Sequence, residues 1–332
     1  MASVFTILFA GLSAAQSFAA EVNVYSGRQE ALIKPLLDKF TAQTGVKVNL
    51  VTGKADALIS RAASEGEFSQ VDLLVMADAG RLVRAKNMRL TQAIGLDLPA
   101  LSSSFIDEEK HWVALTTRAR TVMYKKGSDV VLPESMLALA DKKYAGQICV
   151  RSSSNIYNQS MTAAMMLDKG DEVTSKWAKG IAENMARKPK GGDRDQIKAM
   201  IAGECQFAIA NTYYLGGMLT SSDESQREIA EQVAIAWTPK SEGGTHINIS
   251  GVSIAKHAPN KAAAEQLLTF MLAEEQQAWY AEVNQEYPVI DGVNWSKTLE
   301  RLGRFDAQSV NFNDMGRLNG DALKLMDKAG WQ

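Results

Sequence analysis

The chain has 332 residues, with 36 Lys and Arg against 38 Asp and Glu, which gives a formal net charge of −2. This balance excludes the broad basic surface that nucleic-acid binding needs, and a hydrophobic fraction of 46% excludes a disordered chain. The 2 cysteines are too few for a disulfide scaffold or a four-cysteine zinc site. The 3 histidines lack metal-ligand spacing and are interpreted as surface or structural residues: His111, His246 and His257.

The first twenty residues have the character of a signal peptide. The apolar run from Val4 to Leu12 is too short to span a bilayer, and Phe18-Ala19-Ala20 approaches the A-x-A pattern of cleavage sites. No Lys or Arg precedes Arg28, so the usual basic start is missing, and a buried N-terminal helix is the alternative. We expect cleavage after Ala20 and a mature protein outside the cytoplasm.

The mature chain opens with alternating strands and helices, which predicts a parallel sheet covered by helices on both faces. Apolar alternation and helical periodicity predict strands at 21–26, 46–51 and 71–76 and helices at 30–44, 55–65 and 79–86. Asp78 stands at the cap position of the third helix.

Two long extended stretches, 112–124 and 247–255, predict crossings between two lobes. Further strands are expected at 147–150 and 206–210, and helices near 159–166, 172–185, 194–201 and 261–280, the last capped by Asn260. We therefore predict a two-lobed α/β protein, with a mostly parallel, helix-flanked sheet in each lobe and a ligand cleft between them. The first lobe would comprise 21–118 and 250–288, and the second 119–249 and 289–332.

Tyrosines stand where predicted strands end. Tyr157 follows the strand that holds Cys149, and Tyr213-Tyr214 follow the strand 206–210. Ligands of open α/β sheets bind beyond the carboxyl ends of strands, so these phenols are expected near one point. Neighbouring side chains in a strand face opposite ways, so Tyr213 and Tyr214 share a site only if the strand has ended. The flanking Asn211-Thr212 and Gly216-Gly217, which are turn and cap residues, indicate that it has.

Three phenols without a neighbouring imidazole or thiol indicate a hard cation, because soft metals prefer thiolate and zinc or copper recruits imidazole. Fe(III) fits, since ligation deprotonates a phenol whose pKa is ordinarily about 10. Two alternatives stay open from the residues alone. The tyrosines are either ordinary half-buried aromatics or an aromatic wall for an organic solute such as a polyamine. No Ser-His-Asp, Cys-His or paired-acid arrangement points to an enzyme.

The mature sequence resembles the periplasmic ferric-ion-binding proteins of bacterial ABC importers, within the type II periplasmic binding fold. The combination of SNIYNQ with NTYY is the specific part of the resemblance. Other matching segments cover nearly the whole chain: VYSGRQEALIKPLLDKFTAQTGVKV, VDLLVMADAGRL, TTRARTVMY, KGGDRDQIKAM, GECQFAIA and NQEYPV. The resemblance implies a periplasmic receptor that carries Fe(III) to a membrane permease, and we expect a monomer.

Carried over by motif, Tyr157, Tyr213 and Tyr214 are the phenolate ligands. The arginines of TTRAR, Arg118 and Arg120, lie where the family holds a synergistic anion or balances the charge of the site, and we give more weight to Arg118.

Several family members carry His-Tyr, or a His, just after the first strand, where this chain has Gln29-Glu30. The site is then completed either by a bidentate carbonate or by Glu30, which is otherwise a solvated residue of a first helical turn. We interpret Tyr25 as packing at the cleft floor rather than as a ligand.

Cys149 and Cys205 each stand at the start of a predicted strand that leads to a tyrosine. In an exported protein they form either a disulfide or two buried free thiols. The segment 190–194 is expected to be a loop and a helix cap, although its glycines are able to approach the cleft.

Overall fold

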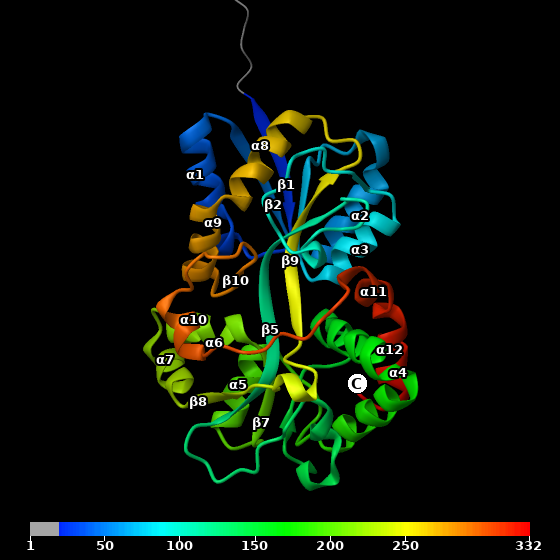
Figure 1. Cartoon of the computed structure of the whole chain (residues 1–332), viewed down its shortest axis with the longest axis vertical. Coiled ribbons are helices and arrows are strands. Elements are labelled where there is room, and N and C mark those ends of the chain that lie inside the picture. The colour runs from blue at the N-terminus through cyan, green and yellow to red at the C-terminus, as the bar shows by residue number, and fades with distance from the viewer. Residues whose placement is uncertain (1–19) are drawn as a thin grey trace, which may run out of the picture.

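The computed structural model describes residues 20–332, and the expected signal peptide falls outside them except for Ala20. Two α/β lobes lie one above the other and share two long strands (Figure 1). These are β5 (Val113–Lys125) and β9 (Ile247–Ala255), which pair antiparallel and run through both lobes as the predicted crossings. Within residues 20–332, no helix has the length and apolar character needed to cross a membrane.

The sheet of the first lobe is built around β1 (Glu21–Ser26). It pairs in parallel with β2 (Lys47–Thr52) and β3 (Leu73–Ala77). Strand β9 pairs antiparallel with β3 and with the short β4 (Thr91–Gln92). Its helices are α1 (Lys34–Thr44), α2 (Ala55–Glu65), α3 (Ala79–Asn87), α8 (Lys261–Leu272) and α9 (Glu274–Trp279).

The sheet of the second lobe forms around the lower half of β5. It pairs antiparallel with β7 (Phe207–Asn211) and β8 (Val233–Ala236), and β6 (Ile148–Cys149) lies parallel to β7. The short β10 (Tyr287–Pro288) joins β5 near the lobe junction. The helices are α4 (Ile156–Glu183), α5 (Asp193–Ile201), α6 (Thr212–Leu219), α7 (Glu224–Glu231), α10 (Lys297–Leu302), α11 (Phe312–Arg317) and α12 (Asn319–Lys328). Because both shared strands run against their neighbours, the sheets are mixed.

Three helices differ from the periodicity-based prediction. The expected helices near 159–166 and 172–185 form α4, which is interrupted at Gly170 (φ 77°, ψ 166°). The expected helix at 261–280 ends at Leu272, because Ala273 is extended, and α9 follows before a π-helix at Tyr280–Asn284. The first helix begins at Lys34, after a 3₁₀ turn at Glu30–Leu32. Asn260 occupies its predicted cap position, but its amide nitrogen donates to Asp72 instead of capping the helix.

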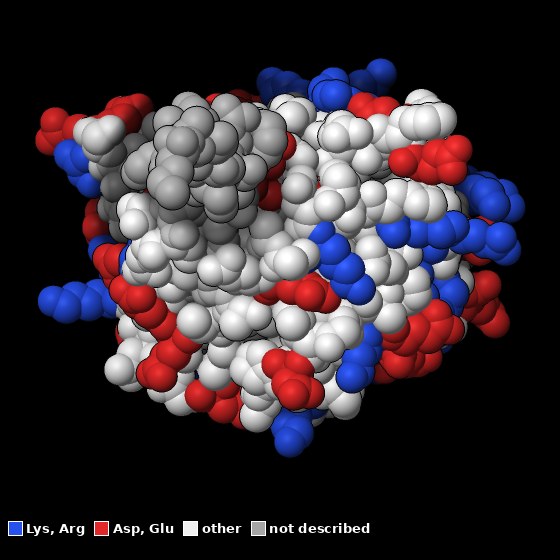
Figure 2. All heavy atoms as spheres, turned by 90° about the horizontal axis from the view of Figure 1, so that it is seen from above, with Lys and Arg blue, Asp and Glu red and all other residues white. Residues whose placement is uncertain are grey.

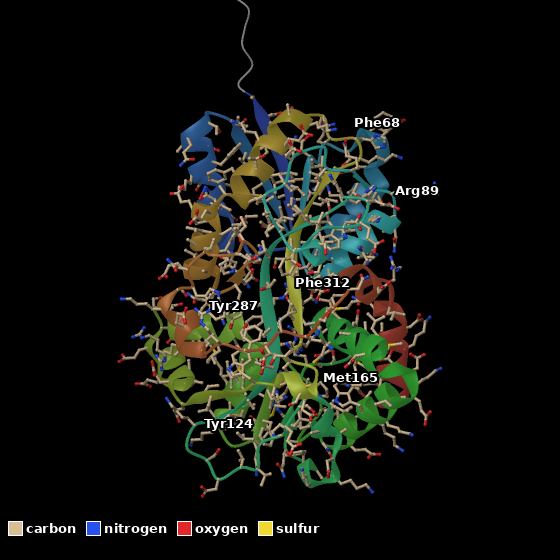
Figure 3. All side chains as sticks on the ribbon, viewed as in Figure 1. Phe68, Arg89, Tyr124, Met165, Tyr287 and Phe312 are labelled. Atoms are coloured by element: carbon tan, nitrogen blue, oxygen red, sulfur yellow. A yellow bond between two sulfur atoms is a disulfide. The ribbon has the colours of Figure 1, made fainter. Side chains whose placement is uncertain are left out.

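The lobes also touch beside the two shared strands, where α11 packs on α3. Phe312 and Met315 of α11 share an apolar core with Leu82 of α3, and Figure 3 places Phe312 at this junction. Gly316 allows the close approach, since a Cβ there would lie 2.6 Å from Cγ2 of Val83. The chain after residue 311 therefore contacts both lobes.

The surface seen from above the first lobe carries Lys and Arg together with Asp and Glu, which lie mainly toward its edges with mostly uncharged residues between them (Figure 2). No continuous field of one sign appears on the described part of this face, in keeping with the balanced composition.

Candidate metal centre

Three tyrosines meet at the start of two helices in the second lobe. Strand β7 ends at Asn211, so Tyr213 and Tyr214 fall in the first turn of α6, and Tyr157 falls in the first turn of α4. The Tyr213 hydroxyl donates a hydrogen bond of 3.1 Å to the Tyr157 hydroxyl, and the rings of Tyr213 and Tyr214 lie 4.3 Å apart between centroids. All three side chains are half-buried.

We had expected the two glycines after the tyrosine pair to be turn or cap residues, but they lie inside α6. Gly216 permits close packing, because a Cβ there would lie 2.7 Å from the Cβ of Gln285 in the segment before β10. The strand has nevertheless ended before Tyr213, so both rings are free to face the same side.

The electrostatic setting of these phenols has two opposing parts. Burial, and next the neighbouring phenols, raise the pKa of Tyr213 well above its usual value, while Arg118 opposes the rise. Burial and Tyr157 likewise raise the pKa of Tyr214. The amino-terminal ends of α4 and α6, in contrast, carry partial positive charge that favours an anionic oxygen. Without a cation Tyr213 and Tyr214 keep their protons at neutral pH, and a strongly charged ion is needed to displace them.

Arg118 lies beside the tyrosines and has hydrogen-bond donors without a partner. Its guanidinium carbon is 5.3 Å from the centroid of the Tyr157 ring, and the side chain is 2% exposed. Nη1 donates to Oγ of Ser250 over 3.2 Å, and Nη2 lies 3.5 Å from Oδ2 of Asp78. Nε and Nη2 are buried without a hydrogen-bond partner, which leaves them for an anion.

Arg120 has a different role from the one that its position two residues from Arg118 suggested. Its guanidinium donates to Oδ1 of Asn158, to Oδ2 of Asp193 over 2.9 Å, to Oδ1 of Asn211 and to the carbonyl of Ile209. These contacts engage all three nitrogens, so Arg120 has no donor left for an anion in the cleft. It joins the start of α4 to the end of β7 and thereby supports both tyrosine-bearing turns.

The candidates from the first lobe do not join the cluster. The Tyr25 hydroxyl donates to the carboxylate of Glu65 on α2, at 3.2 Å from each oxygen, so it is engaged in packing rather than free for ligation. Gln29 and Glu30 are exposed, and the described residues offer neither side chain a hydrogen-bond partner.

The structure adds a buried ion pair that the sequence reasoning missed. Arg28, at the end of the S-x-R segment after β1, donates through Nη2 to Oε2 of Glu286, and both residues are buried. Burial disfavours the charge of Arg28, but Glu286 and, more weakly, Tyr280 and Tyr213 raise its pKa overall. Nε of Arg28 is buried and unpaired. The sequence did hold a signal for each residue. Arg28 stands just after the end of a predicted strand, where ligand-binding residues are expected, and Glu286 lies within the segment NQEYPV, which matches the ferric-ion-binding family.

Arginines already cover faces of the tyrosine rings. Besides Arg118, the guanidinium of Arg151 lies 5.7 Å from the Tyr157 ring centroid, and that of Arg194 lies 6.0 Å from the Tyr214 ring centroid. An organic cation that used the rings as an aromatic wall would compete with these guanidinium groups and be repelled by them. The arrangement therefore favours use of the phenol oxygens over use of the ring faces.

Cys149 and Cys205 form a disulfide rather than two free thiols. Cys149 and Cys205 are bonded with their Cα atoms 5.9 Å apart, which ties β6 to the start of β7. The two strands that lead to the tyrosines are thus held together covalently as well as by pairing.

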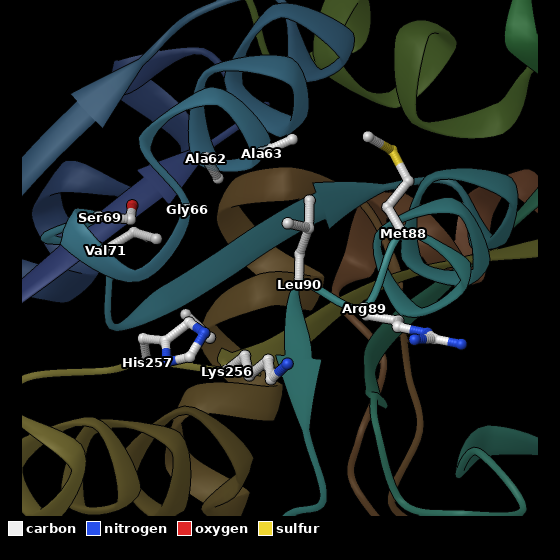
Figure 4. Close-up of a pocket in the computed structure, with 11 residues that line it drawn as sticks. Ala62, Ala63, Gly66, Ser69, Val71, Met88, Arg89, Leu90, Lys256 and His257 are labelled. Atoms are coloured by element: carbon white, nitrogen blue, oxygen red, sulfur yellow. The ribbon is translucent and has the colours of Figure 1, made fainter.

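A separate surface cavity of about 250 Å³ lies in the first lobe, between α2, the end of α3 and the end of β9 (Figure 4). Its walls include Ala62, Leu90 and Val71, with Lys256 and His257 at one side. None of the three strand-end tyrosines lines it, so it has no part in the centre described above.

Comparison with known proteins defines the class. Residues 25–278 match the family model of the bacterial extracellular solute-binding proteins, and the chain belongs to this family, whose members are binding proteins and not enzymes. Iron uptake protein A1 of Synechocystis sp. is 41% identical over 318 residues, which cover 94% of this chain and 88% of that protein.

Solved structures agree over the same length. A Trichodesmium protein in complex with iron and citrate ligands matches with a TM-score of 0.89 at 40% identity, covering 94% of this chain and all of that one. The apo ferric ion-binding protein A of Pasteurella haemolytica matches with a TM-score of 0.88 at 42% identity, covering 94% and 98% of the two chains. The fold is the two-lobed type II periplasmic binding fold, as predicted.

Proposed function

We propose that this protein captures Fe(III) with the phenolates of Tyr157, Tyr213 and Tyr214 and delivers it to the membrane permease of an ABC importer. The hydrogen bond between the Tyr213 and Tyr157 hydroxyls carries the proposal, because it brings oxygen donors from two helices to one point. The similarity to proteins named for iron uptake and ferric-ion binding supports it.

Fe(III) suits this donor set better than other common ions. Phenolate is a hard anionic oxygen donor, whereas softer ions recruit thiolate or imidazole. Within residues 20–332, no three His, Cys, Asp or Glu side chains come together as an alternative metal-binding group. Because Tyr213 and Tyr214 hold their protons in the metal-free protein, an ion of high charge is needed to displace them, which favours ferric over ferrous iron.

Three phenolates leave about three positions of an octahedral ion unfilled. We propose that a bidentate carbonate takes two of them and is held by Arg118 together with Arg28, which both have buried unpaired nitrogens. The guanidinium of Arg118 lies over the Tyr157 ring, and Tyr213 raises the pKa of Arg28. The two guanidinium groups would offer forked donors that match a planar oxyanion, and Glu286 and Asp78 already balance part of their positive charge. Glu30 is the alternative donor, and it would have to turn inward from its exposed position.

Capture and delivery need an exported protein whose lobes close on their ligand. We propose export to the periplasm with residues 1–20 removed, and a monomer whose lobes comprise 21–118 with 250–288 and 119–249 with 289–332. Strands β5 and β9 would act as the hinge, a common device of two-lobed binding proteins.

Iron loading of metal-free protein tests this function. Samples receive ferric citrate, Zn²⁺ or spermidine in parallel, excess ligand is removed by gel filtration, and bound metal is measured by elemental analysis. We expect one iron per chain at a monomer elution volume and no retention of zinc or spermidine. Retention of spermidine or zinc in the absence of iron binding would contradict the proposal.

A further inference from the structure

Asp78 lies at the end of β3 in a backbone conformation that is rare for a residue with a side chain. Its φ is 104° and its ψ is 126°, and its side chain is fully buried. Such a conformation is strained and persists only where the surroundings determine it. A helix cap alone does not require it, since caps ordinarily have extended backbone with negative φ.

The contacts of the Asp78 carboxylate reach three parts of the molecule. Oδ1 accepts hydrogen bonds from the backbone nitrogen of Gly80 at 3.0 Å and from Oγ of Ser160 at 2.6 Å. Oδ2 accepts from Nδ2 of Asn248 on β9 at 2.8 Å, and Nη2 of Arg118 on β5 lies 3.5 Å away. The residue therefore connects the first lobe to both shared strands and to α4.

Every hydrogen-bond partner of the Asp78 carboxylate is a donor, which is the environment of a carboxylate rather than of a carboxylic acid. Burial raises the pKa of the Asp78 carboxyl, and Arg118, Ser160 and the Gly80 amide oppose this rise. A negative charge at this place lies beside Arg118, whose guanidinium lies over the Tyr157 ring.

Two of these contacts act on the proposed iron site. Ser160 lies one helical turn after Tyr157 on α4, so its bond to Asp78 fixes the helix that carries this phenol. The guanidinium of Arg118 stacks on the Tyr157 ring, and Asp78 is its acidic neighbour. Asp78 itself contacts none of the three tyrosines through a hydrogen bond.

We infer that Asp78 is a positioning residue for iron capture. It fixes the helix of Tyr157 through Ser160 and aligns Arg118 with the phenols. While the site is empty, its carboxylate also offsets the positive charge of Arg118. This inference rests on the function proposed above. It follows that Asp78 weakens the hold of Arg118 on the synergistic anion, because the carboxylate competes for Nη2 and repels a second negative charge.

The test compares iron titrations with and without bicarbonate in Asp78→Asn. Asn has nearly the same shape as Asp and keeps an oxygen for the Gly80 amide, so the cap is retained while the charge is removed. We expect the ratio of iron affinities with and without bicarbonate to rise roughly tenfold, as for loss of a unit charge in a medium of effective dielectric constant near 20. In the Arg118→Gln background the same substitution should leave the bicarbonate ratio unchanged.

Asp107→Asn is the matched control. Asp107 is also a buried aspartate of the first lobe, it pairs with Lys86 at 2.9 Å, and its replacement should leave the bicarbonate ratio unchanged. If Asp78→Asn does not fold, Asp78→Ser, another capping residue without charge, serves the same comparison.

An unchanged bicarbonate ratio in a folded Asp78 variant would overturn the inference and leave Asp78 as a cap of α3. That result is distinguishable from failure of the proposed function, because the wild-type protein would still bind iron in the same experiment. A wild-type protein that binds no iron would overturn both.

Discussion

Tyr213 donates a hydrogen bond to the hydroxyl of Tyr157 across 56 residues of sequence. The contact follows from topology, because β6 and β7 are parallel neighbours and each leads into a helix with tyrosine in its first turn. The carboxyl ends of adjacent parallel strands meet at one edge of the sheet, which is where such folds bind ligands. The disulfide between Cys149 and Cys205 holds the same two strands together.

Replacing Tyr157 with Phe should abolish most iron binding with little effect on the fold. The ring stays, but the oxygen donor and the acceptor for Tyr213 are lost. We expect iron affinity to fall roughly 100-fold or more, since even outer-shell partners of metals are worth about 10–100-fold. Isothermal titration with a ferric chelate measures the affinity, and thermal unfolding of the metal-free protein reports stability. Tyr124→Phe, on a half-buried tyrosine of β5, is the control. An equal loss of iron affinity in Tyr157→Phe and Tyr124→Phe would argue against a specific role of Tyr157 in iron binding.

Iron binding should weaken steadily as the pH falls. The pKa values of Tyr213 and Tyr214 are raised in the metal-free protein, so both phenols are protonated throughout the acidic and neutral range and must each release a proton on binding. Affinity should therefore drop by up to about tenfold per pH unit for each phenolate formed. Titrations at several pH values against a fixed chelator measure the slope. Affinity that is independent of pH between mildly acidic and neutral conditions would exclude phenolate ligands.

The two arginines of TTRAR should behave differently when each is changed to Gln. Arg118→Gln should remove the dependence of iron binding on bicarbonate, because its unpaired nitrogens are the ones proposed to hold the anion. Arg120→Gln should keep that dependence but lower the free energy of unfolding by roughly 3–5 kcal/mol, since it leaves the buried Asp193 without its closest cation. Iron titrations in bicarbonate-free and bicarbonate buffers, together with urea unfolding, separate the two effects. Loss of the bicarbonate effect in Arg120→Gln alone would reverse the assignment.

His246 should make the protein less stable in acid. Burial, and next the charges of Arg120 and Arg118, lower its pKa to about 4. Between the unfolded value of about 6.5 and the folded value, the unfolded state binds a proton that the folded state does not. The free energy of unfolding should thus fall as the pH drops through this window, by about 3 kcal/mol in total. Urea unfolding of wild type and His246→Gln measures this loss, with the exposed His257→Gln as control. Parallel profiles for wild type and His246→Gln would contradict the prediction.

Much of the architecture was predictable from local pattern. Apolar alternation at 21–26 and helical spacing at 55–65 correspond to β1 and α2 with the same bounds, because each element buries one face in its lobe. The meeting of Tyr157 with Tyr213 was predictable for the same reason, since a strand end is a position that the sequence reveals. Helix ends set by a single extended residue, such as Ala273, leave no periodic signal.

Other parts of the site depend on partners that are distant in sequence. Arg118 and Arg120 point to one side of β5, yet the residues that saturate Arg120 come from 158, 193 and 211, and no spacing rule brings these together. The pair of Arg28 and Glu286 spans 258 residues. The cap at Asp78 was expected from its residue type, but its positive φ and its bond to Ser160 arise only from tertiary packing.

The most direct test of the central claim is the visible and resonance Raman spectrum of the iron-loaded protein. Phenolate bound to Fe(III) gives a charge-transfer band in the visible range, and excitation in that band enhances tyrosine ring vibrations. We predict a red-orange protein with enhanced tyrosinate modes, whose band is lost in the double variant Tyr213→Phe/Tyr214→Phe. A protein that binds stoichiometric iron but stays colourless, without tyrosinate modes, would show that the ion is held by other groups.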